Sequence, residues 1–303
     1  MPQRSQARRR NIVQIKMLNG QLQLPDAIVW HAYWRDPYHM MLTMSWGSFL
    51  GLISGGYIGI NTLFALLYLI GGNNIVNARP GSFGDAFFFS VQTLASIGYG
   101  VMSPQTLYAN IIVTIEALLG IVSIAVMTGL AFARFSRPSA RVRFSQVAVI
   151  APHNGQLTLI LRTANRRRNQ ILEAQMRVYL LRDEMTLEGH HMRRIYDLDL
   201  LRSRTPSFSL GWVAMHLIDQ SSPLYGVSQA ELLNMHATLS VSVSGLDETV
   251  SQVVHARHVY AAHEVLWNHQ FVDTVHIDAA GHRYIDYDLF DDVLALDAPA
   301  ELT

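Results

Sequence analysis

The chain contains no cysteine among its 303 residues, which excludes disulfide bonds and thiolate-bound metals. It also has no net charge, because 23 Lys and Arg balance 23 Asp and Glu, so we expect no overall attraction to nucleic acid. Only 15% of its residues are charged and 50% are hydrophobic, and its mean hydropathy of +0.17 is high for a soluble protein. We find no nucleophile motif, phosphate-binding loop or pair of catalytic acids, and therefore expect neither an enzyme nor a bound cofactor.

Two long apolar stretches each exceed the roughly 20 residues that a helix needs to cross a bilayer. Residues 47–70 carry no charge, and residues 107–132 are interrupted only by Glu116. A buried core helix usually stops well short of these lengths. The sequence therefore predicts two transmembrane helices, at 47–70 and 107–135, within a pore module that spans 47–135.

Arginine residues flank the two predicted spans unevenly. Basic residues lie before the first span (Arg4, Arg8, Arg9, Arg10, Lys16, Arg35) and after the second (Arg134, Arg137, Arg141, Arg143), whereas Arg79 and Asp85 are the only charges between the spans. Positive charge stays on the cytoplasmic side. We therefore expect a multi-pass protein of the cell membrane with both termini, including the segment 1–32, in the cytoplasm.

The segment 33–46 leads into the first span and is rich in aromatic residues, which favour the membrane–water boundary. Tyr38, Met41 and Leu42 follow helical spacing, and Pro37 suits a first helical turn. This pattern predicts a short interfacial helix that lies along the membrane. The alternative is an early start of the first span.

Residues 83–94 are apolar but too short to span, which is typical of a re-entrant helix. TLASIGYG follows at 93–100, and Gly98 and Gly100 can adopt positive φ without steric cost. Backbone torsions of alternating sign would aim successive carbonyls to one side, and four chains around an axis would stack them into rings that replace the hydration shell of an ion. The negative C-terminal end of the short helix would favour a cation.

The chain resembles the bacterial inward-rectifier (KirBac-type) potassium channels in ARPGSFGDAFFFSVQTLASIGYG, in ARFSRP after the second span and in VHARHVYAAHEVLW. The resemblance implies a homotetramer that passes K+ through a filter, with K+ at its first four positions. The filter residues are Ser96, Ile97, Gly98, Tyr99 and Gly100. The transported ion takes the place of any cofactor.

Two departures from the family pattern concern the filter. Ser96 stands where most potassium filters have threonine; it keeps the hydroxyl but loses a methyl group that stiffens the side chain. The acid–base pair that braces many eukaryotic filters has no counterpart at Gln92 and at Val101 or Met102. Two alternatives therefore stay open: a weakly selective cation channel on this scaffold, and a non-conducting, membrane-anchored binding protein.

On the second span, Gly120, Ile124, Thr128 and Phe132 recur every four residues and so share one helical face. Alone, such a stripe more often indicates helix packing. Beside a pore, we expect it to line the inner cavity, where large apolar residues close a pore by dewetting. The resemblance places Ile124 and Phe132 at the hydrophobic gate, and Ile124 in place of an acid implies weak rectification. Gly129 either gives flexibility to the second span or allows close helix contact, and we interpret it as the second.

Three further positions are assigned to support or regulation. Glu116 is the one charge inside a span, and we expect it behind the filter as a hydrogen-bond acceptor, with Thr93 as a second supporting residue. A partly wet position near the outer end of the helix is the alternative for Glu116. Arg134 and Arg137 lie just after the second span, where each would gain about 1 kcal/mol from anionic lipid headgroups. The preference of basic residues for the cytoplasmic side would by itself also explain their presence. The resemblance favours a lipid site.

The cytoplasmic part, 136–303, alternates in hydrophobicity with the period of half-buried strands, as in TLSVSVS at 238–244. Its turns at 153–156 and 280–281 predict hairpins. Short strands with few helices indicate a β-sandwich, and the resemblance implies an immunoglobulin-like domain that assembles as a fourfold ring. The 13 histidines include His190, His191 and a loose set from His255 to His269, which we interpret as surface or interface residues and not as a metal site.

Overall fold

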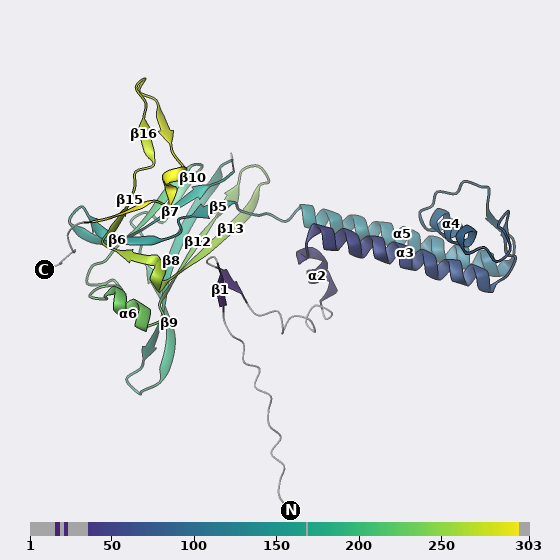
Figure 1. Cartoon of the computed structure of the whole chain (residues 1–303), viewed down its shortest axis with the longest axis horizontal. Coiled ribbons are helices and arrows are strands. Elements are labelled where there is room, and N and C mark those ends of the chain that lie inside the picture. The colour runs from purple at the N-terminus through teal and green to yellow at the C-terminus, as the bar shows by residue number, and fades with distance from the viewer. Residues whose placement is uncertain (1–15, 19–20, 24–35, 168, 297–303) are drawn as a thin grey trace, which may run out of the picture. The chain divides into compact units, whose positions relative to one another are not determined.

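The computed structural model describes residues 16–18, 21–23, 36–167 and 169–296, which divide into two compact units (Figure 1). One unit comprises Asp26–Arg137 and is helical. The other joins Met1–Pro25 to Pro138–Thr303 and consists mainly of strands. Most of the predicted N-terminal segment 1–32 lies outside the described residues.

The helical unit contains two helices that are long and apolar enough to cross a membrane, of 25 and 29 residues. A shorter helix and a pair of two-residue strands lie between them. In chain order the elements are α2 (Pro37–Thr43), α3 (Trp46–Ile70), β3 (Ile75–Val76), α4 (Phe83–Leu94), β4 (Ser103–Pro104) and α5 (Leu107–Phe135). The residues of α4 are those given to the re-entrant helix, and α3 and α5 occupy the two predicted spans.

Hydroxyl side chains fix where the three longer helices begin. Ser45, Ser82 and Thr106 each accept a hydrogen bond from the backbone N–H three residues further on. Such a cap satisfies one of the backbone donors that a first helical turn leaves without a partner. Inside a membrane this matters more than in water, because lipid offers no alternative acceptor.

Helix α2 covers only part of the segment 33–46 for which an interfacial helix is predicted. Asp36 caps α2 by accepting a hydrogen bond from His39 N at 3.0 Å, with Pro37 in the first turn. Met44 then adopts an extended conformation, and Ser45 begins α3. Because α2 and α3 are separated by this break, the first span does not start early. Residues 33–35 of the predicted helix lie outside the described residues.

The second unit is a β-sandwich of two five-stranded sheets, with small peripheral hairpins. Its strands are β1 (Lys16–Leu18), β2 (Gln21–Gln23), β5 (Val142–Phe144), β6 (Ala148–His153), β7 (Gln156–Asn165), β8 (Ile171–Met185), β9 (His191–Leu198), β10 (Arg204–Phe208), β11 (Gly211–Leu217), β12 (Thr238–Asp247), β13 (Gln252–Ala261), β14 (Val265–Trp267), β15 (His269–Phe271), β16 (Val275–Ile277), β17 (Arg283–Ile285) and β18 (Val293–Ala295). One helix, α6 (Gln229–Asn234), and the short 3-10 turns Ala262–Glu264 and Asp288–Phe290 interrupt them.

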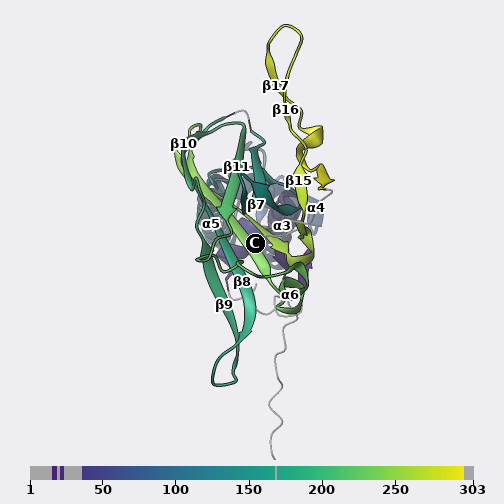
Figure 2. The same ribbon diagram turned by 90° about the vertical axis from the view of Figure 1, so that its left-hand side faces the viewer.

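One sheet runs β10-β8-β12-β13, with β9 also paired to β8, and the other runs β11-β7-β6-β14, with β5 also paired to β7. Nearly all pairings are antiparallel; β14 and β6 are parallel. Apolar side chains from both sheets form one continuous core cluster between them. The predicted sandwich is therefore confirmed, and Figure 2 shows its strands from a second direction.

The alternation read from the sequence selects the buried face of the central strands. Val241 of β12 pairs with Val178 of β8, and both are at most 2% exposed. The polar residues that alternate with the apolar ones along each strand point away from the core, since successive strand side chains face opposite ways. Burial of this apolar face stabilises the sandwich at about 25 cal/mol for each Å² removed from water.

The two predicted hairpin turns are also present. Asn154 and Gly155 adopt positive φ of 51° and 79° between β6 and β7, and Gly281 has φ 84° between β16 and β17. In both views, the β8–β9 hairpin and the β16–β17 hairpin extend from the sandwich in opposite directions (Figures 1 and 2).

Candidate pore, filter support and gate

The filter segment follows directly from the C-terminal end of α4. Ser96 N donates to Thr93 O at 3.0 Å and Ile97 N donates to Gln92 O at 2.8 Å. These hydrogen bonds fix the first two residues of the filter segment to the last turn of α4. Thr93 Oγ1 donates back to Phe89 O at 2.9 Å, inside the helix, which holds that side chain against α4 and not against the filter. The C-terminal end of the helix, where its dipole is negative, therefore lies beside the filter segment.

The backbone of the filter segment alternates in sign. Ser96, Gly98 and Gly100 have φ of 56°, 60° and 81°, whereas Ile97 and Tyr99 keep ordinary negative φ. Two of the three positive values fall on glycine, which enters this region without steric cost. Ser96 is the exception and was not foreseen from the sequence. Such alternation is the geometry that turns consecutive carbonyl groups to one side.

Glu116 lies fully buried against α3 and α4, not in a partly wet position. One carboxylate oxygen is 2.6 Å from the hydroxyl of Tyr68, and the other contacts the hydroxyl of Ser90, on α4. Ser90 also contacts the amide oxygen of Asn61 at 2.9 Å. Sequence reasoning found Glu116 but missed its partners Tyr68 and Ser90, and Asn61 beyond them. The signal was available, because Asn61 and Tyr68 are polar residues seven apart on one face of an otherwise apolar span.

Gly120 belongs to the packing between α5 and α4. It is buried, and a Cβ atom there would overlap the carbonyl oxygen of Leu94, the last residue of α4. The first position of the predicted pore-lining stripe therefore faces the chain's own short helix. By contrast, a Cβ at Gly129 would meet nothing within 4 Å, so the predicted close contact at Gly129 is not made within the chain.

The three other members of the stripe lie on the surface of α5 in one chain. Ile124 is 52% exposed and Phe132 is 72% exposed, and Thr128 between them is exposed as well. Their spacing of four residues keeps them on one side of the helix. They are available to meet the same face of another copy.

Arg134 and Arg137 both hold the C-terminal end of α2, a role that the sequence did not indicate. Arg134 donates to the carbonyl oxygens of Met41 and Met44, the latter at 2.8 Å, and Arg137 donates to Leu42 O at 2.8 Å. These are carbonyls at the negative end of the helix, where a cation is favourable.

Arg134 is fixed more tightly than Arg137. Its guanidinium carbon lies 4.6 Å from the ring centre of Trp46 and 4.5 Å from that of Phe49, both at the start of α3. Cation–π contact of this kind adds to the two hydrogen bonds. Arg137, in contrast, is exposed and makes a single hydrogen bond. We refer to Arg134, Arg137 and the three carbonyls as the arginine clamp.

An ion pair between Arg79 and Asp85 holds the start of α4. Arg79 meets Asp85 with both a side-chain contact at 2.9 Å and a backbone hydrogen bond from its own N–H at 2.9 Å. Asp85 sits in the first turn of α4, where a negative charge also complements the helix dipole. The loop before α4 is thereby tied to the helix.

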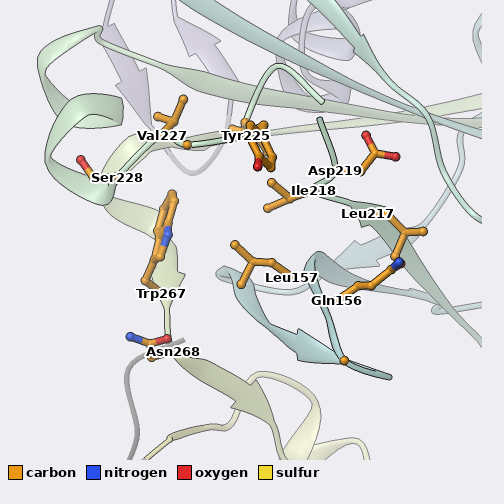
Figure 3. A pocket seen from close by; sticks show the side chains of 13 residues that line it. Gln156, Leu157, Leu217, Ile218, Asp219, Tyr225, Val227, Ser228, Trp267 and Asn268 are labelled. Carbon is orange, nitrogen blue, oxygen red and sulfur yellow. The ribbon is translucent and has the colours of Figure 1, made fainter. Parts of the chain in front are cut away.

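The β unit contains a cavity of about 510 Å³ that none of the predicted site residues lines (Figure 3). Leu157, Ile218, Tyr225 and Trp267 surround it, with Asp219 at its edge. Among the residues that the structure describes, no group of three or more His, Asp or Glu is placed to hold a metal ion.

Comparison with known proteins gives two family matches. The family described as "Ion channel" matches residues 57–137, and the "Inward rectifier potassium channel C-terminal domain" matches residues 142–302. The inward rectifier potassium channel Kirbac3.1 of Paramagnetospirillum magnetotacticum is 48% identical over 258 residues, which are 85% of this chain and 88% of that protein.

Mammalian relatives are more distant. Inward rectifier potassium channel 4 of Homo sapiens is 34% identical over 217 residues, 68% of this chain and 48% of that protein. The ATP-sensitive inward rectifier potassium channel 8 of Homo sapiens is 30% identical over 235 residues, 74% of this chain and 54% of that protein. The chain thus spans about half the length of these two human relatives.

Two apolar helices that flank a short helix and a glycine-rich segment, followed by a β-sandwich, define the chain as a membrane ion channel and not an enzyme. The chain belongs to the inward rectifier potassium channel family, and its similarity to Kirbac3.1 places it with the bacterial members. The family resemblance predicted from the sequence is therefore confirmed.

Proposed function

We propose that four copies of the chain form one pore and that K+ loses its water in a filter built from Ser96, Ile97, Gly98, Tyr99 and Gly100. The observation that carries the proposal is the alternation of positive and negative φ over these five residues at the C-terminal end of α4. Rings of main-chain carbonyls from four chains replace the hydration shell of the ion, and K+ sits at the first four residues. The negative end of α4 adds a favourable field for a cation.

The presence of Ser96 supports a second candidate function. Its hydroxyl can serve the innermost ion site as threonine does in most potassium filters, but its side chain is less restricted. A less selective cation channel on the same scaffold is the alternative that this substitution favours. Bi-ionic potentials distinguish the two, because equal permeability to Na+ and K+ would remove K+ selectivity from the proposal.

The gate is assigned to the exposed stripe of α5. Ile124 and Phe132 are large, apolar and on one face, and four copies of them around an axis would form a constriction that closes by dewetting. Thr128 would line the cavity between them. Ile124 supplies no negative charge to attract a cationic blocker, so rectification by this route is weak.

Regulation by anionic lipid is assigned mainly to Arg137. It is exposed and makes only one hydrogen bond within the arginine clamp, so its other donors can reach a headgroup phosphate. Arg134 acts on the same process indirectly, since its guanidinium already binds two carbonyls and two aromatic rings. The basic flanks of both spans support a topology with both termini in the cytoplasm.

The proposal is tested by rubidium uptake into liposomes that contain the purified full-length protein. We expect uptake that barium blocks and that Gly98→Asp abolishes, because a side chain at φ 60° distorts the filter and adds charge at the ion path. Cross-linking must give a fourfold assembly for both proteins. Uptake that persists in Gly98→Asp, or an assembly other than a tetramer, would contradict the proposed pore.

The gate has a separate test. Phe132→Ala removes the largest side chain of the stripe and is expected to raise the open fraction in single-channel recordings. Val126→Ala is the matched control, since Val126 is 55% exposed and, two residues from both Ile124 and Thr128, lies on the opposite face of the same helix. An unchanged open fraction in Phe132→Ala would remove Phe132 from the gate.

A further inference from the structure

Four fully buried polar side chains form a line of contacts between α5, α4 and α3. Tyr68 Oη lies 2.6 Å from Glu116 Oε2, Glu116 Oε1 contacts Ser90 Oγ, and Ser90 Oγ lies 2.9 Å from Asn61 Oδ1. Each of the four residues is at most 1% exposed. We call these residues the buried polar chain. Its three contacts must each contain a hydrogen, because two bare acceptors at such distances repel each other.

The amide of Asn61 can take only one orientation. Its nitrogen donates to the backbone carbonyl of Tyr57 at 2.7 Å. Turning the amide over would place its oxygen against that carbonyl oxygen, with no hydrogen between them. The amide oxygen of Asn61 therefore faces Ser90 and accepts.

Counting hydrogens then fixes the state of Glu116. Tyr68 supplies one hydrogen and Ser90 supplies one, whereas Asn61 supplies none on this side. An ionised carboxylate also supplies none, so two hydrogens would have to serve three contacts, and one pair of buried acceptors would face each other without a proton. Buried polar groups in proteins are almost always hydrogen-bonded. The third hydrogen must be carried by Glu116.

We infer that Glu116 is a neutral carboxylic acid that donates to Ser90, and that its proton completes the tie between the second span, the short helix and the first span. Tyr68 donates to the other oxygen of Glu116, and Ser90 in turn donates to Asn61. Every member of the buried polar chain is then satisfied. The consequence for conduction rests on the proposed function, because α4 ends at the filter.

The surroundings of Glu116 offer no positive charge to stabilise an ionised form. Helix α3 contains no Asp, Glu, Lys, Arg or His, and its titratable groups are Tyr57 and Tyr68. Helix α4 contributes only Asp85, which pairs with Arg79 at the exposed start of the helix.

On α5 itself, Tyr108 donates to Leu67 O at 2.9 Å, and Arg134 lies 18 residues away, roughly 27 Å along the helix. No basic side chain pairs with Glu116 within the described part of the chain. An unpaired charge in such a place is strongly unfavourable.

Infrared difference spectroscopy of the tetramer in liposomes tests the inference directly. Subtracting the spectrum of Glu116→Gln from that of the wild type at about pH 8, where exposed carboxyl groups are ionised, should leave the carbonyl band of a protonated carboxylic acid. Glu188→Gln is the control: Glu188 is exposed in the β8–β9 turn, so its difference spectrum should contain carboxylate bands. Carboxylate bands in the Glu116→Gln difference would overturn the inference.

Thermal melting of the tetramer gives a second measurement. Glutamine can accept from Tyr68 and donate to Ser90, so Glu116→Gln should melt close to the wild type, whereas Glu116→Ala and Ser90→Ala should both melt lower. If Gln is as damaging as Ala, an ionised carboxylate is required and the inference is wrong. These results are independent of flux: loss of barium-sensitive uptake in the wild type would defeat the proposed function and leave the protonation of Glu116 standing.

Discussion

The two units of the chain place polar and apolar side chains in opposite ways. In the helical unit, Asn61, Ser90 and Glu116 are fully buried, while only 17% and 11% of the apolar windows of α3 and α5 are buried within the chain. In the β unit, β8 and β12 bury alternate apolar residues, and β8 leaves its charged residues Glu173 and Arg177 exposed. The same chain therefore follows two different rules of folding.

The difference comes from the surroundings of each unit. Water drives apolar groups together in the sandwich, but lipid is as apolar as leucine and gives no such drive between helices. Helices in a membrane are held by close backbone approach and by hydrogen bonds that have no other partner. Gly120 and the buried polar chain are examples of each. Substitutions in the two units should consequently fail for different reasons.

The largest effect is expected at Gly120 in the helical unit. In Gly120→Ala, the added methyl group would overlap a backbone oxygen of α4, which cannot rotate away, and the end of α4 must shift beside the filter. We expect most of the barium-sensitive rubidium uptake to be lost. Gly59→Ala on α3 is the control, because a Cβ there meets nothing within 4 Å of the chain. Equal uptake by the two variants would show that backbone contact is not limiting.

The corresponding change in the sandwich is Leu180→Ala. Leu180 is fully buried, so the substitution leaves a cavity and should lower the free energy of unfolding of the β unit by about 2–5 kcal/mol. Denaturant titration of the full-length protein, followed by far-ultraviolet circular dichroism, measures this loss. Leu187→Ala, at a fully exposed turn, should unfold like the wild type. A smaller loss for Leu180 than for Leu187 would contradict the core described above.

The arginine clamp is a set of polar contacts in the helical unit, and single substitutions test it. Arg134→Ala removes two hydrogen bonds to carbonyls and two ring contacts and should destabilise the protein by about 2–3 kcal/mol, whereas the exposed Arg137→Ala should cost less than about 1 kcal/mol. Thermal melting ranks the two variants.

The response to anionic lipid should rank them in reverse, with Arg137→Ala the weaker responder in liposomes of graded anionic content. The double variant should respond least. An identical dose response in the double variant and the wild type would reduce both arginines to structural and topological roles.

The smallest effect concerns His258, a half-buried histidine of the sandwich. Burial against the stacked ring of Phe144 lowers the pKa of His258, and the charge of Glu264 opposes this only in part. Between that lowered pKa and the ordinary value near 6.5, the unfolded chain binds a proton that folded His258 does not, so stability must fall as pH falls below about 6.5. The slope from one such group is at most about 1.4 kcal/mol per pH unit.

His258→Phe isolates this contribution. The variant should lose part of the fall in unfolding midpoint between about pH 7.5 and pH 5.5, and His190→Gln, at an exposed turn, should keep it. Equal pH dependence in the wild type and His258→Phe would show that His258 titrates normally in the folded state.

Local features of the sequence were sufficient for the elements. Lengths of uncharged residues gave the two spans, alternation gave the buried face of β12, and Gly155 and Gly281 marked hairpins that the structure contains. The glycines of the filter indicated its alternating backbone as well. Each of these depends on a residue and its near neighbours, which the chain order fixes directly.

Contacts between residues far apart in the sequence could not be predicted from the sequence. Glu116 was recognised as unusual, but Ser90, Asn61 and Tyr68 lie 26, 55 and 48 positions away from it, and the spacing of Asn61 and Tyr68 indicates only that these two share a helical face. Arg134 was interpreted as a lipid ligand, since the sequence does not show that α2 ends beside it. Gly120 was placed on the pore face for the same reason.

Composition and periodicity determined that this chain has two membrane helices, a short helix followed by a glycine-rich segment, and a β-sandwich, because those patterns reflect the solvent that each segment meets. Tertiary packing alone decided which side of α5 meets α4, which carbonyls Arg134 binds and where Glu116 finds its hydrogen-bond partners. These depend on how helices are rotated against one another, and that rotation is set by the fit of many side chains at once.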